Sequence, residues 1–243
     1  MIIDTHCHYD MFDNPNKIIK DCEIQKIITI GMTNLPSHFE MGFPHLKGYK
    51  YVRMALGLHP LMANEHKIEL VKFKENIDKT SYVGEIGLDF SKEGISTKDI
   101  QIKSFEHVLE LISTKKKIVS LHSRRAENEV LELLRKHRIK NAIFHWYSGS
   151  KTVLKQILES DYFFSINPSM LTSNMGQKLI SEIPLDKILT ETDSPYTMIG
   201  NRRTRPNDVK VVIDYLAKKN GLSVEFVENK IYSNFKSIID KIR

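Results

Sequence analysis

The chain has 243 residues, of which 41% are hydrophobic and 27% charged, a composition typical of a folded globular protein rather than a disordered one. Its formal net charge of +6 and pI near 9.1 favour association with polyanions such as nucleic acids. Only Cys7 and Cys22 are cysteines, the chain starts with no secretion leader, and no apolar stretch reaches the roughly 20 residues of a membrane helix. These features argue against a disulfide scaffold and a membrane protein, and they predict a cytoplasmic protein.

Short apolar segments rich in β-branched residues alternate with longer amphipathic ones along the chain. Strands are predicted at residues 2–5, 26–31, 52–58, 82–86, 118–121, 142–145, 162–166 and 188–191. Helices are predicted at residues 65–77, 96–114, 126–137, 153–159, 206–219 and 223–239, and an irregular loop with a small local element at 35–51. One barrel needs about 250 residues. The sequence therefore predicts a single α/β domain over residues 1–243, folded as a (β/α)8 TIM barrel.

Potential metal ligands follow most of the predicted strands. His6 and His8 stand two residues apart at the end of the first strand, so their side chains point the same way and can share one ion. Later strand ends supply His59, Glu85, His122, His145 and Asp193. Barrel closure brings these ends around one axis, where imidazole and carboxylate groups suit first-row divalent metals. We therefore expect a metal-dependent active site at the carboxyl ends of the strands.

Three of these residues have predicted roles in catalysis. Glu85 lies in a segment flanked by glycines that let the backbone approach a site, and it is placed to bridge two ions; an ion pair with a neighbouring Lys or Arg is the alternative. Asp193 is the candidate general base, although an Asp before Ser-Pro also suits a turn cap. His59 is expected to polarise the substrate, with a hydrogen-bonding role in its loop as the alternative.

Other candidate residues have simpler interpretations. Asp89 is expected to cap a helix or turn, and Cys7, which faces away from its histidine neighbours, to pack in the core. The remaining histidines are expected at the surface; they are His38, His45, His66, His107 and His137.

Arginines surround the expected site. Arg124 follows His122 closely, and arginine binds phosphate oxygens bidentately, so Arg124 is a predicted substrate contact, whereas Arg125 is expected to be solvated. A second basic segment is expected to hold flanking phosphates, with a solvated loop as the alternative; it contains Arg202, Arg203 and Arg205.

The motifs resemble those of the TatD family of metal-dependent deoxyribonucleases, and their order and spacing cover nearly the whole chain. They are Asp4-Thr5-His6-Cys7-His8, Gly57-Leu58-His59-Pro60, Gly84-Glu85-Ile86-Gly87-Leu88-Asp89, Leu121-His122-Ser123-Arg124 and Glu191-Thr192-Asp193-Ser194-Pro195-Tyr196. The blocks that contain Glu85 and Asp193 are the most specific.

The resemblance implies an amidohydrolase-like barrel with two divalent ions, which could be Mg, Mn or Zn. It implies one ion held by His6, His8, Glu85 and Asp193, and a second held by Glu85, His122 and His145. It also implies a 3′ to 5′ exonuclease, often acting on single-stranded DNA, in which His59 lies near the scissile phosphate and Asp193 activates water. DNA is therefore the expected partner.

Two segments depart from the family pattern. Trp146 and Tyr147 stand where cysteine and phenylalanine are common, which predicts a different pocket shape and base stacking. The segment 201–207 replaces the usual Arg-Asn-x-Pro. These departures and the basic run are similar to TatD-like proteins of Qat antiphage defence operons, which would imply protein partners in a defence complex.

Two other functions fit the same residues. A hydrolase of a small amide, ester or lactone would use the same metal barrel, but the fourth strand has no lysine that could be carboxylated, and the arginines favour phosphodiesters. A nucleic-acid-binding or assembly component would keep the metal site without turnover, and the intact ligand set favours an enzyme instead.

Overall fold

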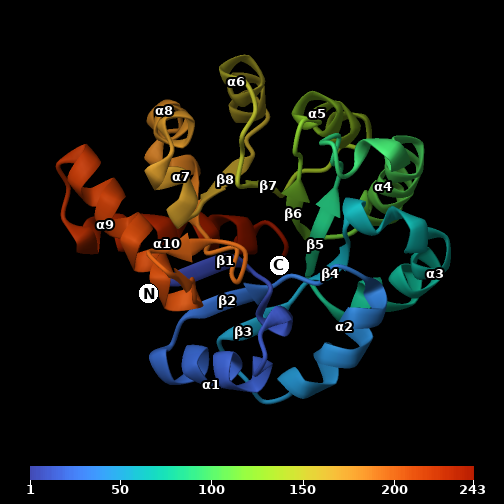
Figure 1. The fold of residues 1–243 in the computed structure, drawn as a ribbon, viewed down its shortest axis with the longest axis horizontal. Helices are drawn as coiled ribbons and strands as arrows, with labels where there is room; N and C mark the ends of the chain where they lie inside the picture. Colours follow the sequence, from blue (N-terminus) through green and yellow to red (C-terminus); the bar gives the residue numbers. More distant parts are fainter.

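The computed structural model describes all 243 residues as a barrel of parallel strands surrounded by helices (Figure 1). The barrel strands are β1 (Ile3–Cys7), β2 (Ile28–Gly31), β3 (Val52–Met54), β4 (Leu56–Leu58), β5 (Tyr82–Gly87), β6 (Ile118–His122), β7 (Ala142–His145), β8 (Phe163–Ile166) and β9 (Ile188–Thr190). They pair in chain order within two parallel sheets, one of β1 to β3 and one of β4 to β9. This arrangement confirms the predicted (β/α)8 barrel.

The first and last strands of the barrel are joined by backbone hydrogen bonds beyond the end of β9. The N–H of Asp193 donates to the carbonyl of His6 at 2.8 Å, and the N–H of His8 donates to the carbonyl of Ser194 at 2.8 Å. The buried carboxylate of Asp4 also accepts the N–H of Thr192 at 2.9 Å. This closure places the residues that follow β9 beside the histidines that end β1.

The strand predicted at residues 52–58 is two strands, β3 and β4, which separate at Ala55. Thr33 occupies the break, because its hydroxyl donates to the carbonyl of Ala55 at 2.9 Å and its own carbonyl accepts the N–H of Glu85 at 3.2 Å. A Cβ at Gly57 would lie 1.6 Å from the carbonyl oxygen of Thr33, so only glycine fits there. The break therefore helps to fix the segment that carries Glu85.

Helices cover the outside of the barrel. They are α1 (Pro15–Gln25), α2 (Pro36–Gly42), α3 (His66–Asn76), α4 (Lys98–Ile112), α5 (Glu127–Lys136), α6 (Lys151–Glu159), α7 (Pro168–Thr172), α8 (Asn174–Glu182), α9 (Val209–Asn220) and α10 (Val224–Asp240). The six predicted helices are confirmed, and α2 is the small local element expected within residues 35–51, whereas α1, α7 and α8 were not predicted. No helix combines the length and apolar character needed to span a bilayer.

Helices α1, α2 and α7 begin at short local signals, namely a capping side chain or a proline, rather than within a long periodic segment. The side chain of Asn14 caps α1 by accepting the N–H of Lys17, and Asn167 caps α7 by accepting the N–H of Met170. Proline occupies the first helical position of α1, α2 and α7. A short hairpin of β10 (Met198–Ile199) and β11 (Arg202–Arg203) was also not predicted.

The apolar core leaves one end of the barrel for polar groups. A cluster of 47 buried residues includes apolar side chains from strands and surrounding helices. A second cluster of 10 buried residues includes Ile3, Ile118 and Leu189 from the starts and middles of strands, together with Phe235 and Ile238 of α10. Because this cluster lies before the strand ends, the polar residues gather at the carboxyl ends of the strands.

Candidate active site

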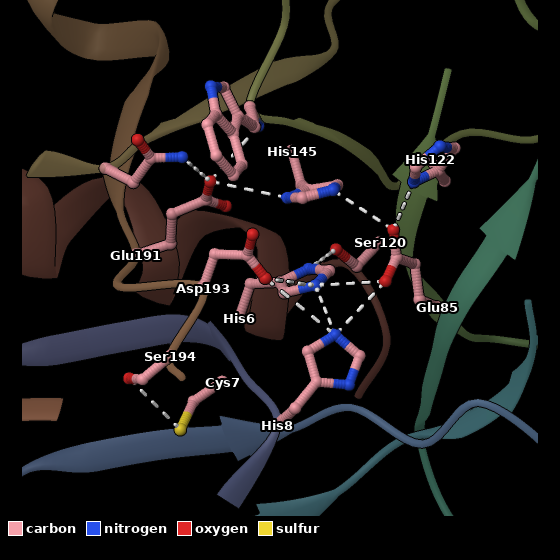
Figure 2. A network of polar contacts seen from close by, with 12 residues as sticks. His6, Cys7, His8, Glu85, Ser120, His122, His145, Glu191, Asp193 and Ser194 are labelled. Carbon is pink, nitrogen blue, oxygen red and sulfur yellow. Dashed lines mark hydrogen bonds and ion pairs between the residues drawn. The ribbon is translucent and has the colours of Figure 1, made fainter. Parts of the chain in front are cut away.

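A cavity of about 640 Å³ opens at the carboxyl ends of the strands. The predicted site residues that line it are His8, His59, Glu85, His122, His145, Asp193 and Arg124. Its lining also includes Asn34, Leu61, Met62, Asp89, Trp146 and Tyr196. His6 is fully buried, and its imidazole faces the same cluster (Figure 2). The structure thus brings together all the residues predicted to bind metal.

The Glu85 carboxylate contacts four imidazoles of this cluster, those of His6, His8, His122 and His145 (Figure 2). Its Oε2 lies 3.2 Å from His8 Nε2 and 3.4 Å from His6 Nε2. Asp193 Oδ1 faces the same two nitrogens, at 3.7 Å from His6 and 3.8 Å from His8. Ligand atoms of His6, His8 and Asp193 all lie within 4.8 Å of one another, so they can converge on one ion with small adjustments.

The other oxygen of Glu85 faces a second pair of imidazoles. Its Oε1 lies 2.6 Å from His122 Nδ1 and 3.1 Å from His145 Nε2. Glu85 therefore stands between two groups of nitrogen donors and presents one oxygen to each. Two further groups have donor atoms close enough to share one ion, namely His6 with Glu85 and His145, and His59 with Glu85 and His122, so the second ligand set implied by the resemblance stays a prediction.

Carboxylates also hold the far sides of two of these imidazoles. His145 Nδ1 lies 3.4 Å from Glu191 Oε1, and His122 Nε2 lies 2.7 Å from Asp89 Oδ2. Such pairs fix the orientation and tautomer of metal-binding histidines. Asp89 has the local role predicted for it, since Oδ1 accepts the N–H of Ser91 at 2.8 Å, but it also orients His122.

Glu191 is a site residue that the sequence analysis missed. Its carboxylate is fully buried and accepts hydrogen bonds from the Trp146 N–H at 3.1 Å, from Asn167 Nδ2 at 2.9 Å and from the Ser165 hydroxyl. The sequence contained a signal for this role. Glu191 directly follows an apolar strand, two positions before Asp193, and an acid buried there needs partners because an unpaired buried charge is costly.

The electrostatic balance of the cluster favours a cation. Burial would raise the pKa of Glu85, but the surrounding imidazoles hold it well below its ordinary value. Burial raises the pKa of Asp193 to about 7 and lowers that of His6 to about 4. The pKa of His145 is well above its ordinary value because Glu191 and Glu85 outweigh its burial. The carboxylates thus stabilise positive charge among the imidazoles, as a divalent ion requires.

The donor chemistry fits divalent metal ions. The candidate ligand atoms are imidazole nitrogens and carboxylate oxygens, which suit Zn or Mn and, for the oxygens, Mg. Cys7 contributes no ligand, since its buried sulfur points away and lies 3.7 Å from Ser194 Oγ (Figure 2). The prediction that Cys7 packs in the core is confirmed.

His59 lies at the wall of the cavity and is held by a second histidine. Its Nδ1 accepts the N–H of Leu61 at 3.2 Å, while its Nε2 lies 3.4 Å from Glu85 Oε2. The predicted surface position of His66 is wrong: it is buried, its Nε2 donates to the His59 carbonyl at 3.0 Å, and its Nδ1 lies 2.6 Å from Ser104 Oγ. The helical signal of α3 did not reveal which face packs against α4.

The rim of the cavity is partly basic and partly aromatic. Arg124 lines it with a half-exposed side chain whose only ion-pair partner is Glu93, 3.7 Å away. Trp146 and Tyr196 also line the cavity. Tyr147 is buried and donates its hydroxyl to the Ser150 carbonyl at 2.8 Å, so of the two unusual aromatic residues only Trp146 shapes the cavity.

The basic segment around β11 does not line the cavity. Arg202 forms a bidentate pair with Asp208, with both N···O distances 2.7 Å. Arg203 and Arg205 are exposed. A contact of these arginines with flanking phosphates stays a prediction.

Comparisons with known proteins agree with this site. The chain is 26% identical to human deoxyribonuclease TATDN3, with all of the chain and 96% of the relative aligned. It is 28% identical to an uncharacterized metal-dependent hydrolase of Methanocaldococcus jannaschii, over 96% of the chain and 94% of the relative. The crystal structure of YJJV, a TatD homolog from Escherichia coli K12, superposes with a TM-score of 0.86 at 22% identity and covers 98% of this chain and 97% of its own, which shows a shared fold.

The family itself is shown by the extent of the sequence match. Residues 3–240 match the TatD related DNase family, and this range includes every residue of the cluster around Glu85. Together with the buried imidazole and carboxylate ligands, this match makes the protein a metal-dependent hydrolase. The chain belongs to the TatD related DNase family.

Proposed function

We propose that the protein is a two-metal exonuclease that removes nucleotides from the 3′ end of single-stranded DNA. The observation that carries this proposal is the position of Glu85, whose two carboxylate oxygens face separate groups of imidazoles within one cavity. A carboxylate in this position can bridge two ions. The 3′ to 5′ direction follows from the family resemblance of the sequence.

The chain's own residues have distinct tasks around the reacting phosphate. When bound, divalent ions would supply Lewis acidity, which polarises the phosphate and lowers the pKa of water. Asp193 can accept the proton of the attacking water, because its buried carboxylate lies beside the imidazoles of His6 and His8. Arg124 is placed to bind a non-bridging oxygen as charge develops.

His59 is suited to donate a hydrogen bond to the phosphate. Because its Nδ1 accepts the N–H of Leu61, the neutral imidazole carries its proton on Nε2, the nitrogen that faces Glu85. Burial lowers the pKa of His59, which favours this neutral form. His59 therefore acts as a fixed donor rather than as a proton acceptor.

The shape of the cavity supports a single-stranded substrate. A volume of about 640 Å³ lies within the range of small-molecule sites, so it accommodates a nucleotide-sized end rather than a duplex. Trp146 and Tyr196 present rings at its wall, where an unpaired base can stack. A small amide or lactone would use neither Arg124 nor these rings, which favours the phosphodiester.

The direct test is cleavage of single-stranded DNA labelled at the 5′ or the 3′ end, with Mg²⁺, Mn²⁺ or Zn²⁺ and with a chelator. We expect 5′-labelled DNA to give a metal-dependent ladder and 3′-labelled DNA to release mononucleotide at once. Glu85→Gln should reduce the rate by at least about a thousandfold, because the carboxylate that both groups of imidazoles share loses its charge.

The matched control is Glu129→Gln, which makes the same change at an exposed position of α5. It should keep the wild-type rate. Activity that survives Glu85→Gln or the chelator would contradict the two-metal proposal, and endonucleolytic fragments would contradict exonuclease action. No cleavage with any of the three metals, beside turnover of amide or ester substrates, would favour the small-molecule hydrolase.

A further inference from the structure

A second cavity, of about 750 Å³, lies at the opposite, amino-terminal end of the barrel. It is bounded by β3, the start of β5, the segment before β3 and the last residues of the chain. The gap exists because β3 pairs only with β2, whereas β4, beyond the break at Ala55, pairs with β5. Near this gap, the hydroxyl of Thr80, which precedes β5, donates to the carbonyl of Met54 in β3 at 2.8 Å.

The charged side chains that line this cavity are all cations. They are Lys47, Arg53, Lys79 and Arg243, and no aspartate or glutamate lines it. Arg53 donates to the carbonyls of Tyr49 at 3.0 Å and Val52 at 2.8 Å and forms no ion pair. Arg243 has one side-chain carboxylate nearby, Asp240, at 3.6 Å, and its main-chain oxygen accepts a hydrogen bond from Lys116 Nζ at 2.6 Å. Such weakly compensated guanidinium groups favour an anionic ligand, and above all a phosphate.

Aromatic side chains lie among these cations. Phe43 lines the cavity and stacks on the buried ring of Phe39 with centroids 4.7 Å apart, so its ring is held in place. Tyr82 also lines the cavity. Burial raises the pKa of Tyr82, and the charges of Arg53 and Arg243, which line the same cavity, oppose this rise. A ligand here meets flat rings together with the positive charge of Arg53, which its hydrogen bonds hold in place, and of three further exposed cations.

We propose that this amino-terminal cavity binds a free nucleoside phosphate, with the base against the aromatic side chains and the phosphate on Arg53 and Arg243. A bare anion would leave the aromatic and apolar lining unused, and an uncharged apolar ligand would leave the guanidinium groups without a partner. The volume falls within the range of small-molecule sites. The inference does not rest on nuclease activity, because no residue of the Glu85 cluster lines this cavity.

Methyl NMR of the full-length protein in Mg²⁺ buffer can follow both cavities in one titration with dAMP. Ile242 lines the amino-terminal cavity and Met62 lines the active-site cavity, so their methyl resonances report on each separately. We expect a saturable shift of Ile242. Arg53→Gln should weaken the affinity measured at Ile242 about tenfold and leave that measured at Met62 unchanged, because a charged hydrogen bond to phosphate is lost.

The matched control is Lys50→Gln, which removes one positive charge from an exposed residue that does not line the cavity. It should leave the Ile242 titration within about twofold of wild type, since an exposed charge outside the cavity is largely screened. Inorganic phosphate and deoxyadenosine should each bind more weakly than dAMP. The proposal is overturned if Ile242 does not shift, if Arg53→Gln binds like wild type, if phosphate alone binds as tightly as dAMP, or if a short oligonucleotide binds more tightly there.

Discussion

The two ends of the barrel carry cavities of similar size whose charged linings differ. At the carboxyl end, buried imidazoles and carboxylates contact one another, and Glu85 links them within hydrogen-bonding distances. At the amino end, the charged lining consists of exposed cations with few acidic partners. The carboxylates of the first cavity are suited to bind cations, and the lysine and arginine side chains of the second are suited to bind an anion.

This contrast also separates two ways in which a barrel supports a site. The carboxyl-end residues are fixed by strand ends and by layers of hydrogen bonds behind them, such as Glu191 behind His145. The amino-end residues come from a loop, a strand start and a helix end. Substitutions at the carboxyl end should therefore have large, graded effects that depend on how close each residue lies to the reacting atoms.

Beside Glu85→Gln, Asp193→Asn should have the largest of these graded effects. The amide keeps the shape of the side chain but cannot accept a proton from water, so we expect kcat to fall roughly 10²- to 10⁴-fold. Single-turnover cleavage of single-stranded DNA measures this loss. Asp186→Asn, at an exposed position, is the matched control and should behave as wild type. A kcat near that of wild type in Asp193→Asn would remove the general base from the proposed mechanism.

Glu191→Gln should act through metal affinity rather than through the chemical step. The substituted amide would keep the size of the side chain while removing the charge beside His145, so the metal concentration for half-maximal activity should rise about 10- to 100-fold. Titration of activity with Mn²⁺ measures this change. The rate at saturating Mn²⁺ should stay within about tenfold of wild type. A lower saturated rate with an unchanged metal requirement would instead place Glu191 in the reaction itself.

These two residues show how far the sequence could be interpreted. Asp193 was predicted because barrel enzymes use the side chains that follow their strands. Glu191 follows the same strand but was passed over, because its position after an apolar strand is a weaker signal than its partners Ser165 and Asn167, which only the fold brings to its carboxylate. Eight strand positions were predicted because apolar runs are a local signal, whereas the break at Ala55 depends on Thr33, a distant residue.

The amino-terminal cavity lay beyond such inference for the same reason. Its lining combines residues 43–54, 79–82 and 239–243, and nothing local to any of these segments indicates that they meet. His66 was likewise assigned to the surface because a histidine on a helix is usually exposed, whereas the structure buries His66 and exposes Ile68 and Val71 of the same helix. Tertiary packing, rather than composition, decides these positions.

His66→Phe tests how far support of the carboxyl end extends. Phenylalanine fills the buried space but cannot donate to the His59 carbonyl, so His59 should shift and kcat/KM should fall about tenfold. The half-maximal Mn²⁺ concentration should not change, because the metal ligands do not depend on this bond. His66→Gln keeps an N–H donor and should recover part of the activity. Equal losses in both variants, or a changed metal requirement, would contradict a positioning role.

The smallest effects are expected at the arginines of β11, where paired and unpaired cations stand side by side. Arg202 already holds Asp208 through two hydrogen bonds, whereas Arg203 forms no ion pair.

If this segment holds flanking phosphates, Arg203→Gln should lower the salt dependence of DNA affinity by about one phosphate contact. Arg202→Gln should change that slope less and lower the free energy of unfolding by about 1 kcal/mol, because the buried Asp208 carboxylate then keeps only the N–H of Arg205 as a partner. Binding of single-stranded DNA in a chelator, measured over a range of salt concentrations, compares the two variants. The same small change in slope for both would mean that the whole segment is solvated, and a larger change for Arg202 would mean that DNA displaces Asp208 from its guanidinium group.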